Sequence, residues 1–198
     1  MKLKDNYKTS DVSRLSSRYK NEVISRMMEK FGYKSPMAVP KIEKVVINSG
    51  FGREVSGKTS SEREKFIKYI LDVLARITGQ RPVLQKARKS ISSFKLRKGM
   101  PIGAKVVLRR QKMYDFLEKL ILLVLPRTRD FRGISLKSVD REGNLTLGFK
   151  EYSPFPEVVL EKEKGIFGLE VTVVTNAKTR EESIELLKLM GFPFKTEH

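Results

Sequence analysis

Short segments in which apolar and polar residues alternate are the feature that most constrains how this chain folds. Leu145, Leu147 and Phe149 fall on one side of an extended segment over residues 144–150, and residues 169–175 alternate in the same way. Alternation is typical of a sheet with one covered face and one exposed face, whereas strands buried on both faces are apolar throughout. We therefore expect a sheet that is covered on one face only.

Three more strands are expected earlier in the chain. Residues 40–48 (PKIEKVVIN) are rich in β-branched residues and lead to Gly50, where the strand ends. Residues 82–87 and 103–109 form two short strands on either side of a basic loop.

Apolar residues recur at helical spacing over residues 15–31, 61–78, 113–124 and 180–190. The residues expected to end these helices are, in order, Gly32, Gly79, Pro126 and Gly191. Two of the helices begin with a capping box, formed by Ser61 with Glu64 and by Thr179 with Glu182.

The expected order of elements is helix, strand, helix, two strands, helix, about three strands and helix. Because the strands alternate, we predict the α+β class: a two-layer sandwich with a mixed, mostly antiparallel sheet and helices packed on one face. We expect a single domain over residues 1–198. Within it, residues 1–39 form an N-terminal helical arm and residues 86–101 form the basic loop.

Residues 73–114 contain 12 Lys and Arg residues and no Asp or Glu, in a chain whose formal net charge is +18. Solvated surfaces normally mix the two signs, because neighbouring like charges repel. One sign over so long a segment indicates a polyanionic partner, and nucleic acid is favoured over an acidic membrane surface.

The composition argues against several chemistries. There is no Cys and the only His is His198, so thiolate sites, imidazole catalysis and His-based zinc sites are not expected. The longest apolar run, residues 120–125, is too short to span a bilayer, and no apolar signal segment follows the N-terminus. We expect a soluble protein of the cytosol or an organelle matrix, without metal, cofactor or membrane association.

The basic loop over residues 86–101 is the first candidate site. It carries six basic residues, three serines and Phe94 between two strands. Cations and hydroxyls bind phosphate oxygens, and an aromatic ring can stack or anchor. The alternative is a disordered, solubilising loop. Nucleic-acid contact is favoured because the unmixed charge continues into Lys105, Arg109 and Arg110.

Two other segments are less decisive. Residues 126–133 (PRTRDFRG) fit equally well a structured turn, with Asp130 paired and Phe131 packed inward, or a set of arginines presented to a phosphate or an acidic partner. Residues 48–52 (NSGFG) lack the spacing of nucleotide-binding glycine motifs, which favours an ordinary tight turn.

Four carboxylates are a candidate catalytic or Mg²⁺ site: Glu157, Glu161, Glu163 and Glu170. General acid–base pairs need two converging carboxylates in a shielded site. Lysines at 162 and 164 lie between these acids, so a solvated surface is favoured.

Several motifs, in order and spacing, resemble the bacterial-type L-five family of large-subunit ribosomal proteins, which binds 5S rRNA. They are PKIEKVVIN (40–48), TGQRP (78–82), KARKSISSFKLRKGMPIG (86–103), LPRTRDFRG (125–133), GNLTLGFKE (143–151) and GFPF (191–194). The resemblance runs from about residue 10 to the C-terminus. It implies a two-layer α+β sandwich in the central protuberance of the large subunit.

The resemblance also implies roles for individual residues. The sheet side of the family grips a 5S rRNA loop, which assigns to 5S rRNA binding Lys41, Asn48, Ser49, Gly50, Gln80 and Lys105. The family's long basic loop faces the elbow of P-site tRNA, which assigns to a tRNA-facing role Lys86, Arg88, Lys89, Ser90, Ser92, Phe94, Lys95 and Arg97. The intersubunit-bridge side would carry Arg127, Arg129, Asp130, Phe131 and Arg132.

Three places depart from the family pattern. Ser49 stands where Met is usual, and residues 157–164 match the family's acidic stretch poorly. Val107 stands where Thr is usual, which removes a hydroxyl from the expected RNA face.

We therefore predict a structural RNA-binding protein of the large ribosomal subunit, without enzymatic activity, in a bacterial cytoplasm. The implied partners are 5S rRNA, P-site tRNA, 23S-type rRNA, neighbouring large-subunit proteins and a protein of the small-subunit head. The alternative is a free-standing basic RNA-binding regulator or RNA chaperone. A metal-dependent nuclease would have to use Glu157 or Glu161.

Overall fold

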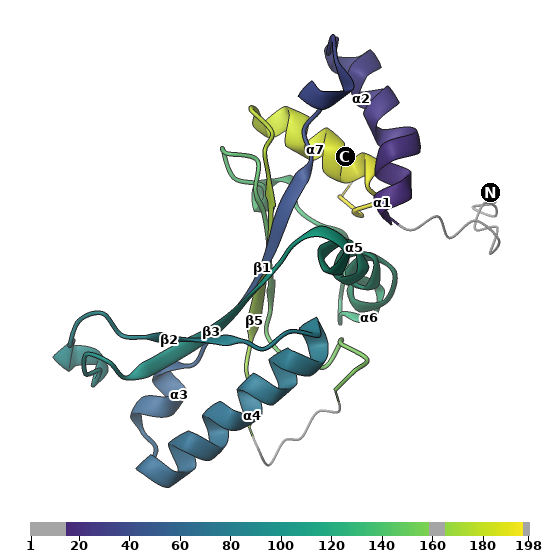
Figure 1. Ribbon diagram of the computed structural model, residues 1–198. Helices are drawn as coiled ribbons and strands as arrows, with labels where there is room; N and C mark the ends of the chain where they lie inside the picture. The colour runs from purple at the N-terminus through teal and green to yellow at the C-terminus, as the bar shows by residue number, and fades with distance from the viewer. Residues whose placement is uncertain (1–14, 159–164, 196–198) are drawn as a thin grey trace.

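The computed structural model describes residues 15–158 and 165–195. Its strands are β1 (Ile42–Gly50), β2 (Val83–Lys86), β3 (Pro101–Leu108), β4 (Leu145–Phe149) and β5 (Leu169–Thr175). These five described strands form one open sheet in the order β2-β3-β1-β5-β4 (Figure 1), and every neighbouring pair is antiparallel. The predicted class is confirmed, although two strands rather than about three follow the third helix in the described part of the chain.

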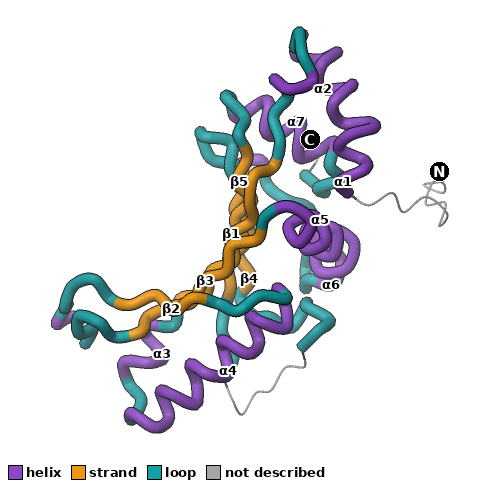
Figure 2. The backbone as a smooth tube through the Cα atoms, viewed as in Figure 1, coloured by secondary structure: helices purple, strands orange, loops and turns teal. Residues whose placement is uncertain are grey.

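Helices gather on one side of this sheet. The helices are α1 (Leu15–Arg18), α2 (Ile24–Phe31), α3 (Gly52–Ser56), α4 (Ser60–Thr78), α5 (Arg110–Lys119), α6 (Leu125–Arg127) and α7 (Arg180–Leu189). Short π-helical segments, η1 (Tyr19–Val23) and η4 (Leu120–Val124), join α1 to α2 and α5 to α6. Single 3₁₀ turns are η2 (Pro36–Ala38), η3 (Ser92–Phe94) and η5 (Leu136–Ser138). Figure 2 shows α4, α5 and α6 on the same side of the strands, and none of the described helices is long and apolar enough to cross a membrane.

The core lies between the sheet and these helices, and the predicted alternation decides which strand residues enter it. Ile47 of β1 pairs with Val106 of β3 on one side and with Val171 of β5 on the other. All three are almost completely buried, whereas the residues between them are more accessible. The covered face is therefore the side of the sheet that carries the odd-numbered residues of the β1 strand, such as Val45 and Ile47.

The predicted helix ends are partly correct. Thr179 and Glu182 form the expected capping box at the start of α7. At the start of α4, however, the box is formed by Thr59 and Glu62, not by Ser61 and Glu64. Both pairs have the required spacing, and the structure uses the earlier one because the helix starts at Ser60. Gly32 and Gly79 adopt left-handed conformations immediately after their helices, as predicted.

Pro126 does not end the third helix, which continues to Arg127. Pro126 lies near the end of one helical stretch that runs from α5 through the π-helical segment η4 into α6, since Val124 and Leu125 both keep right-handed helical dihedral angles. The segment after Gly50 also differs from the predicted loop, because residues after Phe51 form the short helix α3.

The described part of the predicted N-terminal arm packs against the rest of the molecule; its first 14 residues lie outside the description. Val23 and Met27 are fully buried in the core. The Tyr19 hydroxyl donates a hydrogen bond to the Pro40 carbonyl oxygen at 3.0 Å. Burial raises the pKa of Tyr19 to about 12, with a smaller contribution from neighbouring Tyr114.

Candidate nucleic-acid interface

The sheet has one face that the helices leave uncovered, and strand register decides which side chains lie on it (Figure 2). Residues that pair across neighbouring strands point to the same face. Lys105 of β3 pairs with Val83 of β2 and with Asn48 of β1, and Asn48 pairs in turn with Glu170 of β5. These four side chains therefore cross the uncovered face in one row.

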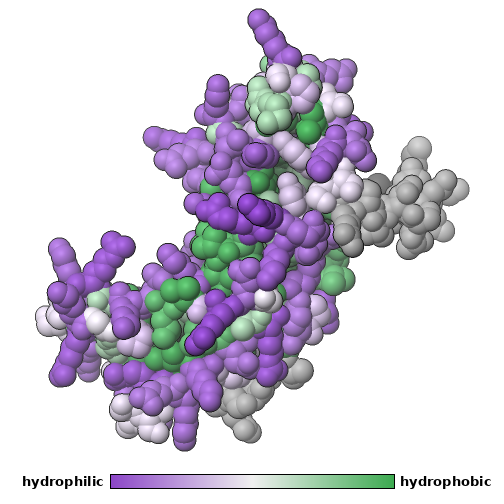
Figure 3. Space-filling model, in the orientation of Figure 1, coloured by the Kyte–Doolittle hydropathy of each residue, from purple (hydrophilic) through white to green (hydrophobic). Residues whose placement is uncertain are grey.

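Two further rows flank this one. On one side Val107 pairs with Val46, and on the other Gly103 lies between Gln85 and Gly50. Val83 and Val107 are exposed by 60% and 37%, which is unusual for valines. Figure 3 shows hydrophobic side chains over these strands, bordered by hydrophilic ones. A surface that mixes apolar, amide and ammonium groups suits unpaired bases, whose faces are apolar and whose edges are polar.

Three of the residues predicted to bind 5S rRNA come together on this face. Asn48 and Lys105 are direct cross-strand partners, and Gly50 pairs with Gly103 in the next row. Gly50 is exposed, and the space where a Cβ would sit is open to at least 4 Å, so a ligand can approach its backbone closely.

Lys41 and Gln80 lie away from that group. Lys41 precedes β1 and is seven residues from Asn48, which corresponds to about 23 Å along an extended strand. Its backbone N–H donates to the Asn176 side chain at 2.6 Å, while its own side chain is exposed. Gln80 follows α4, and its backbone N–H donates to the Thr78 hydroxyl at 3.3 Å.

Ser49, which was also predicted to bind 5S rRNA, does not present its side chain on the uncovered face. Ser49 is only 1% exposed, and its hydroxyl donates a hydrogen bond to the Gly168 carbonyl oxygen at 2.8 Å. Strand side chains alternate between faces, so the neighbours of Asn48 must point into the covered side. The departure from the family pattern at Ser49 is therefore a difference in packing beneath the sheet. Val107, the other such departure, does lie on the uncovered face.

The basic loop continues the β2–β3 pair outward, at the far end of that arm in Figure 1. Ile91 and Leu96 exchange two backbone hydrogen bonds, at 3.0 and 3.1 Å, and the Lys98 N–H donates to the Ser90 hydroxyl at 2.9 Å. The predicted tRNA-facing residues are all exposed: Lys86, Arg88, Lys89, Ser90, Ser92, Phe94, Lys95 and Arg97. None of the cations among them has an ion-pair partner within the described residues.

The segment after α6 combines the two readings that the sequence left open. Phe131 packs against the core, and Asp130 adopts a left-handed conformation with φ of 56°. The Arg129 and Asp130 side chains are 3.8 Å apart but 94% and 87% exposed, so their ion pair contributes little stability. Arg127 and Arg132 are exposed as well, which leaves this turn structured and its arginines available to a partner.

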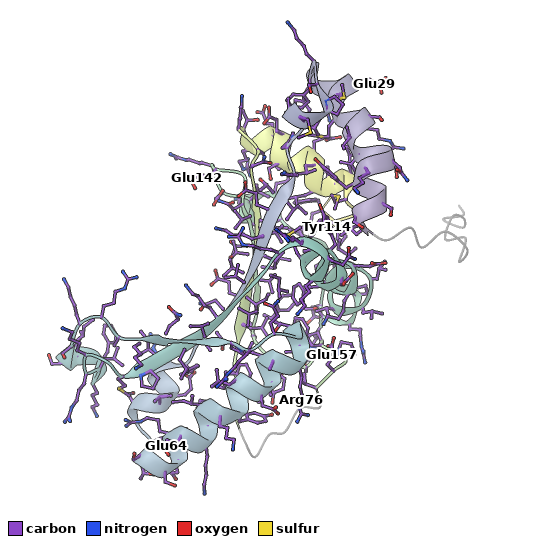
Figure 4. The ribbon with its side chains drawn as sticks, in the orientation of Figure 1. Glu29, Glu64, Arg76, Tyr114, Glu142 and Glu157 are labelled. Carbon is purple, nitrogen blue, oxygen red and sulfur yellow. The ribbon has the colours of Figure 1, made fainter. Side chains whose placement is uncertain are left out.

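The two candidate carboxylates that the structure describes, Glu157 and Glu170, do not converge. Glu157 forms a short ion pair with Lys119, whose ammonium also donates to the Ile77 carbonyl oxygen at 2.6 Å. Figure 4 shows Glu157 beside the end of α4 that carries Arg76. Glu170 lies on the uncovered sheet face instead. Glu161 and Glu163 fall outside the described residues, and among the residues that are described no cluster of acids or His is placed to hold a metal ion.

Sequence reasoning placed Val107 on the RNA face but missed Val46, Val83 and Gln85. The signal for Val46 was present, because every second residue of a strand shares a face and Val46 lies two positions from Asn48. Val83 and Gln85 required knowledge of how β2 pairs with β3, which the sequence does not contain.

Comparison with known proteins is consistent across most of the chain. A family model described as "Ribosomal protein L5" matches residues 35–97, and a second model, for the C-terminus of the same ribosomal protein family, matches residues 101–194. The protein "Large ribosomal subunit protein uL5" of Dictyoglomus thermophilum is 54% identical over 181 residues, which cover 91% of this chain and 98% of that protein. Proteins of the same name from Halothermothrix orenii and Alkaliphilus oremlandii are 50% and 51% identical, each over 92% of this chain and 99% of their own length.

Proposed function

This chain belongs to the ribosomal protein L5 family, which makes it a structural component of the large ribosomal subunit and not an enzyme, and we propose that it binds 5S rRNA through its uncovered sheet face. The observation that carries the proposal is the row in which Lys105 and Asn48 stand side by side between Val83 and Glu170. An ammonium group for phosphates, an amide for base edges and an exposed apolar surface are the groups that irregular RNA loops require.

We infer that three surfaces of the protein bind three different partners. The sheet face holds 5S rRNA, the basic loop faces P-site tRNA, and the arginines of the turn after α6 form part of a bridge to a protein of the small-subunit head. Contacts with 23S-type rRNA and neighbouring large-subunit proteins complete the assembly. The support is charge and exposure: the loop cations have no ion-pair partners within the described residues, and Arg127, Arg129 and Arg132 are exposed. The bacterial relatives are consistent with a ribosome in a bacterial cytoplasm.

A salt titration tests the central proposal. Binding to 5S rRNA is measured beside binding to a tRNA and to a generic RNA duplex, from low to high salt. A preference for 5S rRNA that survives high salt is expected, because hydrogen-bonded recognition is less sensitive to salt than phosphate neutralisation. Equal affinities that fall together would contradict it and would favour a free-standing basic RNA-binding regulator or RNA chaperone.

A further inference from the structure

Two hollows lie on the α3 side of the basic loop, and the half-buried side chain of Leu96 lines both of them. The smaller has a volume of about 340 Å³ and the larger about 840 Å³. Residues of α3 also line both, with Gly52 in the smaller and Ser56 in the larger, so the two are neighbours. Figure 1 shows α3 beneath the β2–β3 arm.

The smaller hollow combines an aromatic ring with a backbone wall. Phe94, Arg53 and Glu54 line it together with Gly50 and Gly52. The Phe94 ring is 56% exposed, and no other aromatic ring among the described residues stacks on it. Unstacked bases bind on such rings and on arginine planes. The volume is at the low end for small-ligand pockets, which suits a single base with its sugar.

Glu54 adds a carboxylate to the lining of this hollow. Its side chain is exposed, and its carboxylate has no hydrogen bond or ion pair with any described residue. A carboxylate offers two acceptor oxygens side by side. Guanine is the base whose Watson–Crick edge presents two adjacent donors, N1–H and N2–H, to such a pair.

The larger hollow differs from the smaller one in the charge of its lining residues. It is lined by the cations Arg63, Lys95 and Arg97 and by the serines Ser56, Ser90 and Ser92, with no carboxylate among its lining residues. The Ser56 hydroxyl already donates to the Arg53 carbonyl oxygen at 2.9 Å. Arg63 donates from Nη2 to the Lys58 carbonyl oxygen at 3.2 Å, and its Nε is buried without a partner in the described structure. Lys95 adopts a left-handed conformation with φ of 51°, an uncommon state for a residue with a side chain. Guanidinium groups and hydroxyls placed together are the usual partners of phosphate.

We propose that the two hollows together bind one unstacked guanosine nucleotide of a single-stranded RNA segment. In the smaller hollow the base lies against Phe94 with its donor edge on Glu54. The flanking phosphate lies in the larger hollow, on the other side of Leu96, and is held by Arg63 and Arg97. The inference rests on the proposed function in that the chain binds RNA, and it adds a base-specific site that is separate from the uncovered sheet face.

The full-length protein is titrated with the pentanucleotides UUGUU and UUAUU, with GMP, and with inorganic phosphate, while backbone amide NMR signals are followed. UUGUU is expected to shift the amides of Gly52, Glu54 and Phe94 and to bind at least about tenfold more tightly than UUAUU, the discrimination that one bidentate base contact provides. Phosphate alone is expected to shift only signals of the larger hollow. Free GMP that binds as tightly as UUGUU would overturn the assignment to an RNA strand.

Two variants localise the effect. Glu54→Gln is expected to remove the preference for UUGUU, and Phe94→Leu to weaken both pentanucleotides about tenfold. Glu29→Gln, at the opposite end of the molecule in Figure 4, is the matched control and should change neither. All three side chains are exposed, and the amide spectrum itself reports whether each variant is folded.

Binding of 5S rRNA is measured on the same samples. If 5S rRNA binds but the pentanucleotides are not distinguished, the nucleotide site is wrong while the proposed function stands. If UUGUU is preferred but 5S rRNA does not bind, the proposed function fails and the nucleotide site stands on its own.

Discussion

The hydroxyl of Ser49 donates a hydrogen bond to the carbonyl oxygen of Gly168, 2.8 Å away, and this bond ties the central strand of the sheet to the residue that leads into β5. Ser49 is buried on the covered face, one position from Asn48 on the uncovered face. Stability and RNA binding are therefore assigned to adjacent residues of one strand, and substitutions can separate them.

Ser49→Ala is expected to lower the free energy of unfolding by about 1–2 kcal/mol, because the Gly168 carbonyl loses its side-chain partner in a buried setting. Urea unfolding measures the loss. The affinity for 5S rRNA, measured where both proteins are fully folded, should stay within about twofold of the parent. A large loss of affinity with unchanged stability would show that Ser49 contributes directly to 5S rRNA binding.

Lys105→Gln is expected to weaken 5S rRNA binding and to reduce the slope of log affinity against log salt by about one, the signature of one lost phosphate contact. The reason is its exposed ammonium in the central row of the uncovered face. Lys20→Gln, which removes an equally exposed cation from the helical side, is the matched control. Equal effects of the two substitutions would mean that only overall charge matters.

Gln80→Ala is expected to cost about 1–3 kcal/mol of 5S rRNA affinity with little change in the salt slope, if its amide binds a base edge. Filter binding at several salt concentrations gives both quantities. Gln80 follows α4 and precedes β2, outside the central row of the sheet. An unchanged affinity would therefore confine the interface to the residues of that row.

Arg88→Ala combined with Lys89→Ala is expected to leave 5S rRNA affinity nearly intact and to weaken the binding of P-site tRNA to reassembled ribosomes. Both side chains are exposed on the loop beyond the β2–β3 pair. The two affinities are measured on the same protein preparation. A large loss of 5S rRNA binding would show that the loop belongs to the other RNA.

Tyr19→Phe should change how stability depends on pH. The pKa of Tyr19 is raised from 10.0 to about 12 by burial, so the folded protein keeps the phenol protonated where the unfolded chain loses the proton. Its stabilising contribution is complete below pH 10 and is lost as the pH rises through about 12. The variant should be about 1 kcal/mol less stable at pH 9, because the hydrogen bond to Pro40 is gone.

This deficit should shrink as the pH rises from about 9 to about 11.5, because only the parent protein carries the Tyr19 phenol. Urea unfolding of both proteins at the two pH values measures it. A deficit that stays constant would mean that Tyr19 ionises alike in the folded and unfolded states.

The local features of this fold were predictable and the non-local ones were not. Alternation identified the last two strands and their buried residues, such as Leu145 and Val171, because strand side chains have a period of two. The same period places the side chains of Asn48 and Ser49 on opposite faces, because the two residues are neighbours on one strand. The start of α4 was ambiguous because two overlapping segments had the spacing of a capping box.

The candidate sites also combine local features that were predictable with non-local features that were not. The exposure of the loop cations followed from unmixed charge, since a cation without a nearby acid stays in solvent. Phe94 and Glu54 line the same hollow because of how the loop lies against α3, a helix far earlier in the sequence. Contacts of that kind come from tertiary structure and have no counterpart in periodicity or spacing.

The position of β1 at the centre of the sheet affects how the protein matures during synthesis. Its two neighbours, β3 and β5, are made later, and Ser49 and Gly168 at the facing strand ends are 119 positions apart in the chain. At typical elongation rates this is a delay of roughly 6–24 s, during which the edge of β1 that pairs with β5 has no partner strand. A nascent chain at that stage already carries the cations of residues 73–114 and strands β1 to β3, but not β5. The uncovered face proposed to bind RNA is therefore complete only once β5 has been made.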